Sequence, residues 1–465
     1  MTLLDSVSVD PRAGRPIPDA ATRETIGYAP VHSSAYLDEA IAAARRAQPT
    51  WDAIGHVERS RILNDIADDI RANADELAVI LSREQGKPLD GPNARFEVAA
   101  AELWTRNAAD TRLEPEIVFE SEDGRAEVHY GALGVVAAIG PWNWPMMITV
   151  WQIAPSLRMG NTVIVKPSEY TPLSVLALLA IYNRHLPSGV LTSVVGDREI
   201  GAALAAHSGL DKIMFTGSTD TGRRIIEGSA HNLARLTLEL GGNDAGIVLP
   251  GADLSQLIEG IFWGSFLNSG QTCANLKRLY VHESLYDEAV AELATLATEV
   301  AMGNGLQPGN LLGPLQNQRQ FDTVSALVED ARARGARVVA GGTPAPELGP
   351  LFYRATIVAD VDDDARLVTE EQFGPVLPVL RYSNIDDAII RANNTEQGLG
   401  ASVWGPDIDE AKTVAQRLDA GTVWINQHGT LNPLVPFGGL KASGYGQEFG
   451  VQGLKAVGAP KVISH

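Results

Sequence analysis

Apolar residues recur at helical spacing through much of the first ninety positions. Three sets each share one side of a helix: Leu37, Ile41 and Ala44; Ile62, Ile66 and Ile70; and Leu77 and Ile80. Apolar positions three and four residues apart are typical of amphipathic helices, which bury one face against a core. We therefore expect the first ninety residues to be helical and to cover a sheet.

The pattern changes between residues 116 and 130. Two strand-like runs, 117–119 and 126–128, flank the dipeptide Asp123-Gly124. Asp-Gly between two extended runs is typical of a tight hairpin turn. We expect a β-hairpin here, and a polar hairpin that interrupts an α/β chain is typical of an interface.

Beyond residue 134, short apolar runs alternate with helical stretches. A first set of runs lies at 135–139, 162–165, 193–195, 212–215 and 236–238, and a second at 245–249, 278–281, 337–340 and 421–426. This alternation predicts parallel sheets with crossover helices. We expect two tightly packed α/β units with a ligand cleft between them, beyond the carboxyl ends of the strands. Asn143, Lys166 and Glu239 follow three of the runs at that edge.

The 27 residues from 131 to 157 contain no ionisable group, a length that would cross a bilayer. Three prolines and the side chains of Asn143 and Gln152 would leave polar groups unsatisfied in lipid. The segment therefore predicts a buried strand, a turn and the start of a helix. Because the N-terminus lacks the basic and apolar regions of a secretory signal, we expect a cytoplasmic protein.

Composition narrows the range of partners. The chain has 465 residues, of which 45% are hydrophobic, and a formal net charge of -20. Its length favours two or three structural units over a single core. A negative charge of this size repels the phosphates of nucleic acids and of anionic membranes, so we expect neither as a partner.

Cys273 is the only cysteine. An intrachain disulfide and a zinc site with several thiolates are therefore excluded, and no cluster of histidines and cysteines predicts a metal site. The residue lies in a polar stretch, 268–274, where Gly270 lets the backbone approach a ligand closely. That setting favours a nucleophile. The alternative is a small buried hydrophobic residue.

Two further side chains fit the same chemistry. Asn143 lies in a turn between Pro141 and Pro145, where its amide either donates to an oxyanion or bonds to its own backbone. Glu239 ends an apolar run before a pair of glycines. If it is buried there, its pKa is raised and it can act as a base on water. The alternative is an acid on the surface.

Two segments suit a dinucleotide. Residues 215–222 put hydroxyl residues and glycines between a strand and a helix start, where a pyrophosphate binds well, although the glycine spacing differs from the common fingerprint. Lys166 and Glu169 offer a cation and a carboxylate at a strand end. They form either a clasp for ribose hydroxyls or a surface ion pair.

Seven ordered motifs spread over nearly the whole chain. They are Pro141-Trp142-Asn143, Lys166-Pro167-Ser168-Glu169, Phe215-Thr216-Gly217-Ser218, Leu238-Glu239-Leu240-Gly241-Gly242, Gly270-Gln271-Thr272-Cys273, Glu370-Glu371-Gln372-Phe373-Gly374-Pro375 and Pro436-Phe437-Gly438-Gly439-Leu440-Lys441-Ala442-Ser443-Gly444. With these motifs the chain resembles the aldehyde dehydrogenase superfamily in its non-acylating, NAD(P)-dependent form.

The resemblance implies an α/β fold with two Rossmann-like parallel-sheet domains and a β-hairpin oligomerisation arm. The NAD-binding domain would comprise 1–111 and 132–241, and the catalytic domain 242–434. The oligomerisation segments would be 112–131 and 449–465, giving a homodimer or a homotetramer.

The resemblance also implies a mechanism for aldehyde oxidation. The Cys273 thiolate attacks the aldehyde, and the Asn143 side chain and the Cys273 N–H hold the oxyanion. Hydride then passes to the nicotinamide. Glu239 deprotonates the water that hydrolyses the thioester, and a carboxylic acid is released.

Cofactor residues are implied in the same way. They are Ile139, Pro141, Trp142, Lys166, Ser168, Glu169, Gly196, Phe215, Thr216, Gly217, Ser218, Thr221, Leu240, Gly241, Glu371 and Phe373. Lys166 and Glu169 would hold the adenosine ribose, and Glu371 the nicotinamide ribose. Because a carboxylate beside the ribose repels a 2′-phosphate, Glu169 favours NAD over NADP.

The implied substrate residues are Trp144, Met147, Trp151, Thr272 and His428. They favour an apolar or aromatic aldehyde, while the alternative is that the aromatic residues belong to the core and that the histidine is structural. Asn243 and Gln372 depart from the commonest family pattern, outside the three catalytic positions.

Two competing functions remain. A CoA-acylating relative would share the fold and the thiol, but such enzymes typically lack the glutamate, so Glu239 favours hydrolysis. An inactive structural or binding homologue would keep the fold alone, and the joint presence of Asn143, Glu239 and Cys273 argues against it.

Overall fold

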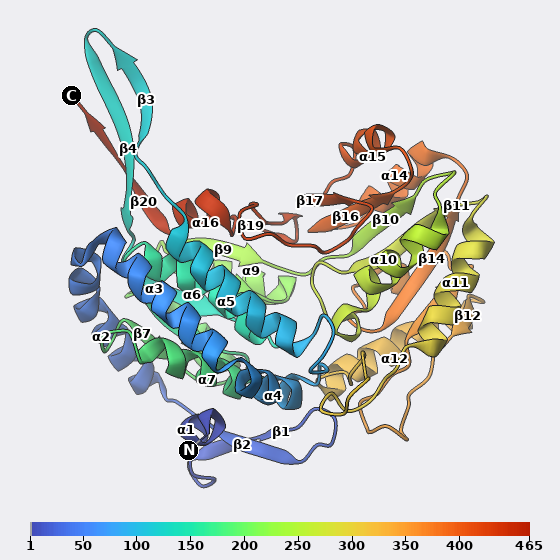
Figure 1. Ribbon diagram of the computed structural model, residues 1–465, viewed down its shortest axis with the longest axis horizontal. Coiled ribbons are helices and arrows are strands. Elements are labelled where there is room, and N and C mark those ends of the chain that lie inside the picture. Colours follow the sequence, from blue (N-terminus) through green and yellow to red (C-terminus); the bar gives the residue numbers. More distant parts are fainter. Residues whose placement is uncertain (1) are drawn as a thin grey trace.

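The computed structural model describes residues 2–465 of the chain. One half of the molecule is built on a sheet of six strands (Figure 1). Its order is β19-β9-β8-β5-β6-β7. Its strands are β5 (Val135–Ile139), β6 (Thr162–Lys166), β7 (Leu191–Ser193), β8 (Lys212–Thr216), β9 (Arg235–Glu239) and β19 (Gly444–Tyr445). Strands β5 to β9 run parallel, as predicted, and β19 is antiparallel to β9. Strand β7 begins and ends two residues before the predicted run of 193–195. Val194 and Val195, the apolar residues of that run, are buried just beyond the end of the strand.

A sheet of seven strands forms the other half, in the order β12-β13-β14-β11-β10-β16-β17. Its strands are β10 (Asp244–Val248), β11 (Leu276–His282), β12 (Arg337–Ala340), β13 (Thr356–Ala359), β14 (Val376–Tyr382), β16 (Gly400–Trp404) and β17 (Thr422–Ile425). All pairs are parallel except β12 with β13. The sequence analysis missed β13, β14 and β16. These strands are almost wholly buried, but so are β5, β6, β8 and β10, which it found, so burial alone does not explain the omission.

Helices cover both sheets. Those that accompany the first half are α2 (Ser34–Ala53), α3 (Gly55–Ala72), α4 (Ala74–Gln85), α5 (Ala94–Asp110), α6 (Pro145–Arg158), α7 (Pro172–Asn183), α8 (Arg198–Ala206) and α9 (Thr219–Ser229). Those of the second half are α10 (Leu254–Phe266), α11 (Tyr286–Glu299), α12 (Gln318–Ala333), α13 (Arg366–Thr369), α14 (Ile385–Asn393) and α15 (Ile408–Ala415). The predicted α/β fold is confirmed.

The prediction of helices throughout the first ninety residues is correct from residue 34 onward and wrong before it. Before residue 34 the only helix in the described chain is the short α1 (Leu3–Val7). Two strands, β1 (Gly14–Pro18) and β2 (Thr25–Pro30), pair antiparallel after it. Pro16 and Pro18 in β1 and Pro30 in β2 lack backbone donors and oppose a helix. The predicted covering helices are α2, α3 and α4.

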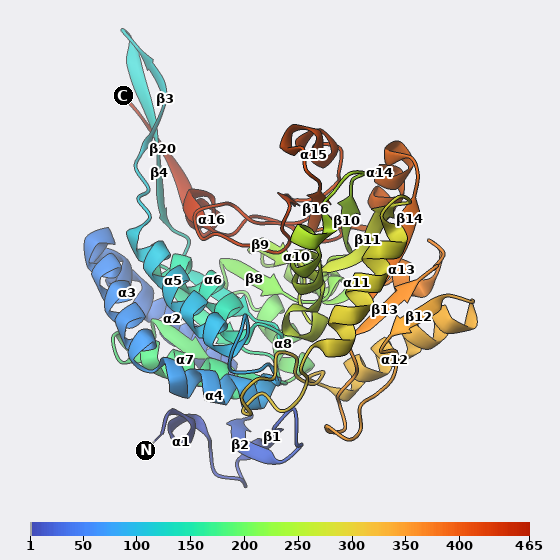
Figure 2. The same cartoon turned by 45° about the vertical axis from the view of Figure 1, so that its right-hand side comes forward.

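The predicted hairpin is present as an arm that projects from the body (Figures 1 and 2). It consists of β3 (Glu116–Ser121) and β4 (Gly124–Ala132), and β20 (Gly458–Ser464) pairs with β4 to make a three-stranded antiparallel sheet. Its apolar side chains are exposed, with Phe119 at 56% and Val462 at 63%. The arm therefore presents apolar side chains to its surroundings.

The uncharged segment from residue 131 to residue 157 forms the end of β4, strand β5, a turn and most of α6, as predicted. Both β5 and the first ten residues of α6 are buried throughout. Within residues 2–465, no helix has the length and apolar character needed to cross a membrane.

Candidate active site

The thiol lies on a tight loop that follows α10. A short 3-10 turn, η1 (Leu267–Gly270), precedes it, and Asn268, Ser269 and Gly270 all have positive φ angles of 51°, 54° and 74°. A Cβ on Gly270 would stand 2.0 Å from the carbonyl oxygen of Gly374, so only glycine allows this approach. The loop that carries Cys273 is thereby packed against the segment that leads into β14.

Cys273 itself is half-buried. Burial raises the pKa of its thiol to about 12, while the Lys277 ammonium lowers that pKa and the carboxylates of Glu371 and Asp244 raise it. A thiol with so high a pKa is mostly protonated at neutral pH. Its reactivity therefore depends on the charges around it.

Asn143 reaches the thiol loop from the turn between β5 and α6. Its side-chain amide donates to the carbonyl of Gln271 over 3.0 Å, and the indole N–H of Trp144 donates to the Thr272 hydroxyl over 3.0 Å. The Asn143 side chain thus bonds to the other loop, which argues against a turn residue that bonds to its own backbone. The structure brings together the two residues that the sequence analysis put at an oxyanion site.

A buried ion pair that the sequence analysis missed supports this turn. The Lys87 ammonium bonds to the Glu97 carboxylate at 2.5 Å, and both side chains are fully buried. Lys87 also donates to the Asn143 carbonyl over 2.8 Å, and Glu97 accepts from the N–H groups of Met146 and Met147 at the start of α6. Lone charged residues in helical or loop sequence carry no signal of burial, so no pattern could have found the pair.

Glu239 is the last residue of β9 and is only 4% exposed, which rules out a surface acid. Neither carboxylate oxygen has a hydrogen-bond partner within the described chain. Burial raises the pKa of Glu239 well above its ordinary value, and the nearby carboxylate of Glu448 raises it further. Glu448, which the sequence analysis also missed, is itself buried without a donor. The arrangement keeps a carboxyl group free of bonds and poised to exchange a proton.

The Lys166 side chain ends β6 and is buried, which lowers the pKa of its ammonium. Its ammonium donates to the Pro167 carbonyl over 3.4 Å. Glu169 is half-buried, and Arg15 donates to its backbone carbonyl. Within residues 2–465, no ion pair joins Lys166 to Glu169, so the surface ion pair considered above is absent. Ser168 is buried beside them.

Residues 215–222 form the predicted strand, turn and helix start. Phe215 and Thr216 end β8, and Ser218 caps α9 by accepting from the N–H of Thr221 over 3.3 Å. The first turn of α9 thus presents backbone N–H groups beside small residues, which suits an anion. Gly196 lies beyond β7, and Ile139 ends β5 at the same edge.

The segment that follows α13 contributes an acid and an aromatic ring. Glu371 accepts from the Gly242 N–H over 3.1 Å and pairs with the Lys277 ammonium at 2.5 Å. The Phe373 ring meets that of Trp142 edge to face, with 5.4 Å between centroids. Of the two unusual residues, Asn243 donates to the Val368 carbonyl and Gln372 to those of Lys277 and Val376, so both hold the surrounding backbone.

The candidate substrate residues on α6 and in the turn before it are buried in an aromatic cluster. Trp144, Met147 and Trp151 are 2%, 6% and 5% exposed, and Trp151 packs against Trp104 and Phe449. The rings of Trp104, Trp151 and Phe449 line a shallow hollow whose lining does not include Cys273. The thiol packs instead against the edge of the large apolar core to which these rings belong.

His428 has partners of its own. Its Nδ1 lies 3.0 Å from the Ser402 hydroxyl and its Nε2 lies 3.5 Å from a carboxylate oxygen of Asp244. The imidazole is fully buried in this pair. These surroundings favour a structural histidine, which the sequence analysis gave as the alternative to a substrate residue.

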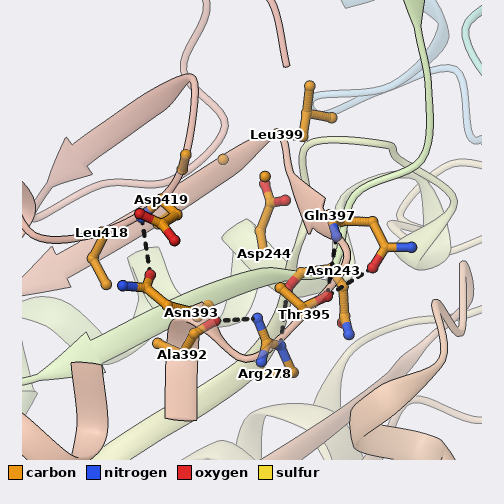
Figure 3. Close-up of a pocket in the computed structure, with 15 residues that line it drawn as sticks. Asn243, Asp244, Arg278, Ala392, Asn393, Thr395, Gln397, Leu399, Leu418 and Asp419 are labelled. Atoms are coloured by element: carbon orange, nitrogen blue, oxygen red, sulfur yellow. Dashed lines mark hydrogen bonds between the residues drawn. The ribbon is translucent and has the colours of Figure 1, made fainter. Parts of the chain in front are cut away.

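Residues of β10 and β16 are among those that line a second hollow, which contains none of the candidate catalytic side chains (Figure 3). Asn243, Asp244, Arg278 and Asp419 are among the residues around it. The Arg278 guanidinium points to backbone carbonyls, donating to Asn243 and Ala392 over 2.9 Å each. Both carboxylate oxygens of Asp244 and the Oδ1 of Asn243 are buried there without a hydrogen-bond donor from the described residues. Because none of the candidate catalytic side chains lines the hollow, we assign it no part in the reaction.

Comparisons with known proteins show which proteins this chain is similar to. A family model described as "Aldehyde dehydrogenase family" matches residues 10–463. The geranial dehydrogenase of Castellaniella defragrans is 38% identical over 445 residues, covering 94% of this chain and 92% of the relative. The NAD+ complex of an aldehyde dehydrogenase from Bacillus cereus superposes with a TM-score of 0.93 at 35% identity, over 97% of this chain and 93% of that one. The structure of an NADP-dependent enzyme of E. coli superposes with a TM-score of 0.94 at 34% identity, over 97% of this chain and 94% of that one.

Proposed function

This chain belongs to the aldehyde dehydrogenase family, and from that premise we propose that it oxidises an aldehyde to the carboxylic acid, with NAD as the hydride acceptor. One observation carries the proposal most directly. The Asn143 amide bonds to the loop of the sole cysteine, while Glu239 is buried with both oxygens free. A nucleophile, an amide donor and a base of raised pKa are the three groups that acyl chemistry of this kind requires.

Each of the three groups has a separate task. The Cys273 sulfur forms a bond to the aldehyde carbon, and the carbonyl oxygen becomes an oxyanion. The Asn143 amide and the Cys273 N–H stabilise that oxyanion. NAD, when bound, supplies the hydride acceptor that turns the adduct into a thioester. Glu239 then takes a proton from water, whose oxygen replaces the sulfur at the acyl carbon and frees the acid.

The residues that would hold the dinucleotide fit its chemistry. Ser218 and the start of α9, with Thr216, Gly217 and Thr221 beside them, offer donors to a pyrophosphate. Lys166, Ser168 and Glu169 would bind the adenosine ribose. The remaining members of the proposed set are Ile139, Pro141, Trp142, Gly196, Phe215, Leu240, Gly241, Glu371 and Phe373. We assign NAD over NADP because the Glu169 carboxylate would repel a 2′-phosphate.

We also propose an apolar or aromatic aldehyde as the substrate. Trp144, Met147 and Trp151 belong to the large apolar core of the first half, and Cys273 packs against that core. Thr272, which precedes the thiol, accepts a hydrogen bond from Trp144. Apolar surroundings bind apolar groups and disfavour charged ones. The hydrogen bond of His428 to Ser402 and the full burial of its imidazole beside Asp244 support leaving it out of the substrate set.

The exposed apolar strands of the arm support an oligomer. We propose that 112–131 and 449–465 join subunits into a homodimer or a homotetramer. The NAD-binding domain would be 1–111 with 132–241, and the catalytic domain 242–434.

The test is the formation of NADH by the purified protein with short aliphatic, long aliphatic and aromatic aldehydes and with semialdehydes. We expect turnover without CoA, loss of turnover in Cys273→Ala, and a stall after one turnover in Glu239→Gln. Turnover that requires CoA would replace hydrolysis with acyl transfer. Binding of NAD without NADH formation from any aldehyde would favour a binding protein that has kept the fold.

A further inference from the structure

Lys277 is a buried cation beside the thiol loop. It is the second residue of β11, and its side chain is 1% exposed. Its ammonium donates to the carbonyls of Gly242 over 2.9 Å and Cys273 over 2.6 Å, and to the Glu371 carboxylate over 2.5 Å. Three donors meet three acceptors, so the ammonium is fully bonded and held in one place.

Glu371 is fixed from several sides but keeps an open edge. The oxygen that Lys277 contacts also accepts from the Gly242 N–H over 3.1 Å. A Cβ on Gly241 would stand 2.4 Å from the other oxygen, so glycine is needed there for the carboxylate to fit. With its side chain 23% exposed, Glu371 remains accessible to a ligand.

Three charged side chains act on the thiol. Against the larger effect of burial, Lys277 lowers the pKa of Cys273, whereas Glu371 and Asp244 raise it. Lys277 and Glu371 form an ion pair, so each offsets part of the effect of the other. Whatever changes the charge of one partner changes the field of the pair at the sulfur.

We propose that Lys277 is a positioning residue that couples the nicotinamide-ribose site at Glu371 to the reactivity of the Cys273 thiol. This rests on the proposed function, which gives Glu371 its ribose. Ribose hydroxyls that donate to Glu371 neutralise part of its charge, and the ammonium then acts more strongly on the sulfur. Lys277 thereby makes the thiol more reactive when the cofactor site is filled than when it is empty.

Alkylation by iodoacetamide tests the coupling, because the sole cysteine gives a single signal. The full chain is alkylated across a range of pH, with and without ADP-ribose, which carries the ribose but no nicotinamide to cover the thiol. We expect ADP-ribose to accelerate alkylation of the wild type. Lys277→Met should slow alkylation about tenfold at a given pH and Glu371→Gln should accelerate it, with the double variant near the wild type. Both single variants should lose the response to ADP-ribose.

If Lys277 had only a structural role, substitutions of the two members of its ion pair would not change the alkylation rate in opposite directions. Equal pH profiles for the wild type and a folded Lys277→Met would overturn the proposal. If Lys277→Met does not fold, Glu371→Gln decides alone: slower or unchanged alkylation, or a retained ADP-ribose response, contradicts the coupling. Calorimetry measures the binding of ADP-ribose and so distinguishes a failure of the proposed function from a failure of the role of Lys277. A wild type that does not bind ADP-ribose contradicts the proposed function, whereas one that binds it without a change in alkylation contradicts the role of Lys277.

Discussion

The indole N–H of Trp144 donates to the Thr272 hydroxyl, and this bond of 3.0 Å joins the turn of Asn143 to the residue that precedes Cys273. Both side chains are buried, so water does not compete for the bond. The proposed oxyanion donor, Asn143, and the proposed nucleophile, Cys273, therefore lie on two loops whose neighbouring residues are hydrogen-bonded to each other.

Trp144→Phe keeps an aromatic ring, although a smaller one, and removes this bond. A hydrogen bond of this kind contributes about 1 kcal/mol. We expect kcat/KM for the aldehyde to fall roughly fivefold, with the affinity for NAD unchanged. Steady-state kinetics measure the first and fluorescence titration the second. Trp263→Phe, a half-buried tryptophan on α10, is the matched control and should leave both values unaltered. An equal effect in the two variants would contradict the role assigned to the bond.

Glu97→Gln breaks the fully buried pair with Lys87. Removing one partner leaves a buried ammonium uncompensated, so we expect a loss of about 3–5 kcal/mol in the free energy of unfolding. Urea unfolding followed by fluorescence measures it. The exposed pair of Glu58 and Arg61 provides the comparison, because Glu58→Gln should leave the unfolding midpoint unchanged. Similar midpoints for the two variants would show that Lys87 finds another partner.

The pH dependence of thioester hydrolysis should follow Glu239. Its pKa is raised by burial and by Glu448, and only the deprotonated form takes a proton from water. The rate therefore rises as the pH increases through that pKa. Glu448→Gln removes the like charge, lowers the pKa of Glu239 and moves the acidic limb to lower pH.

Single-turnover experiments that follow the release of the carboxylic acid at a series of pH values measure the acidic limb of this profile. In Glu239→Gln this acidic limb should disappear together with hydrolysis. A limb that stays in place in Glu448→Gln would mean that the two carboxyl groups do not interact.

Glu169→Ser should improve the use of NADP. Removing the carboxylate beside the adenosine ribose relieves its repulsion of a 2′-phosphate, and we expect kcat/KM for NADP to rise about tenfold while that for NAD falls. Initial rates with the two cofactors give the ratio. Glu199→Ser, an exposed acid at the start of α8, should leave the ratio as it is. An unchanged ratio in Glu169→Ser would assign the choice of cofactor to other residues.

The catalytic candidates were predictable because each interrupts a clear pattern. Asn143 and Glu239 are polar residues that follow buried apolar runs, and Cys273 is the only thiol in a polar stretch. The parallel sheets followed from the alternation of runs and helices. Strand β13 was missed although it is as fully buried as β5 and β10, which were found.

The supporting charges were not predictable from the sequence. Lys277 and Glu371 are 94 residues apart, and Lys87 lies 56 residues from the Asn143 carbonyl that it contacts. Sequence patterns report how a residue sits on its own helix or strand. They do not report which distant charge will share its buried site, because that depends on how the loops pack.

The last strands of the chain complete sheets that begin far earlier. Strand β19 pairs with β9, β20 pairs with β4, and the Ser443 hydroxyl donates to the Gly241 carbonyl 202 residues away. During synthesis, β9 therefore emerges from the ribosome long before its edge partner exists. Contacts of such high sequence separation form late and slow the folding of a chain. A nascent chain shorter than about 445 residues leaves the strand of Glu239 with an open edge, which makes it a natural client for chaperones until translation ends.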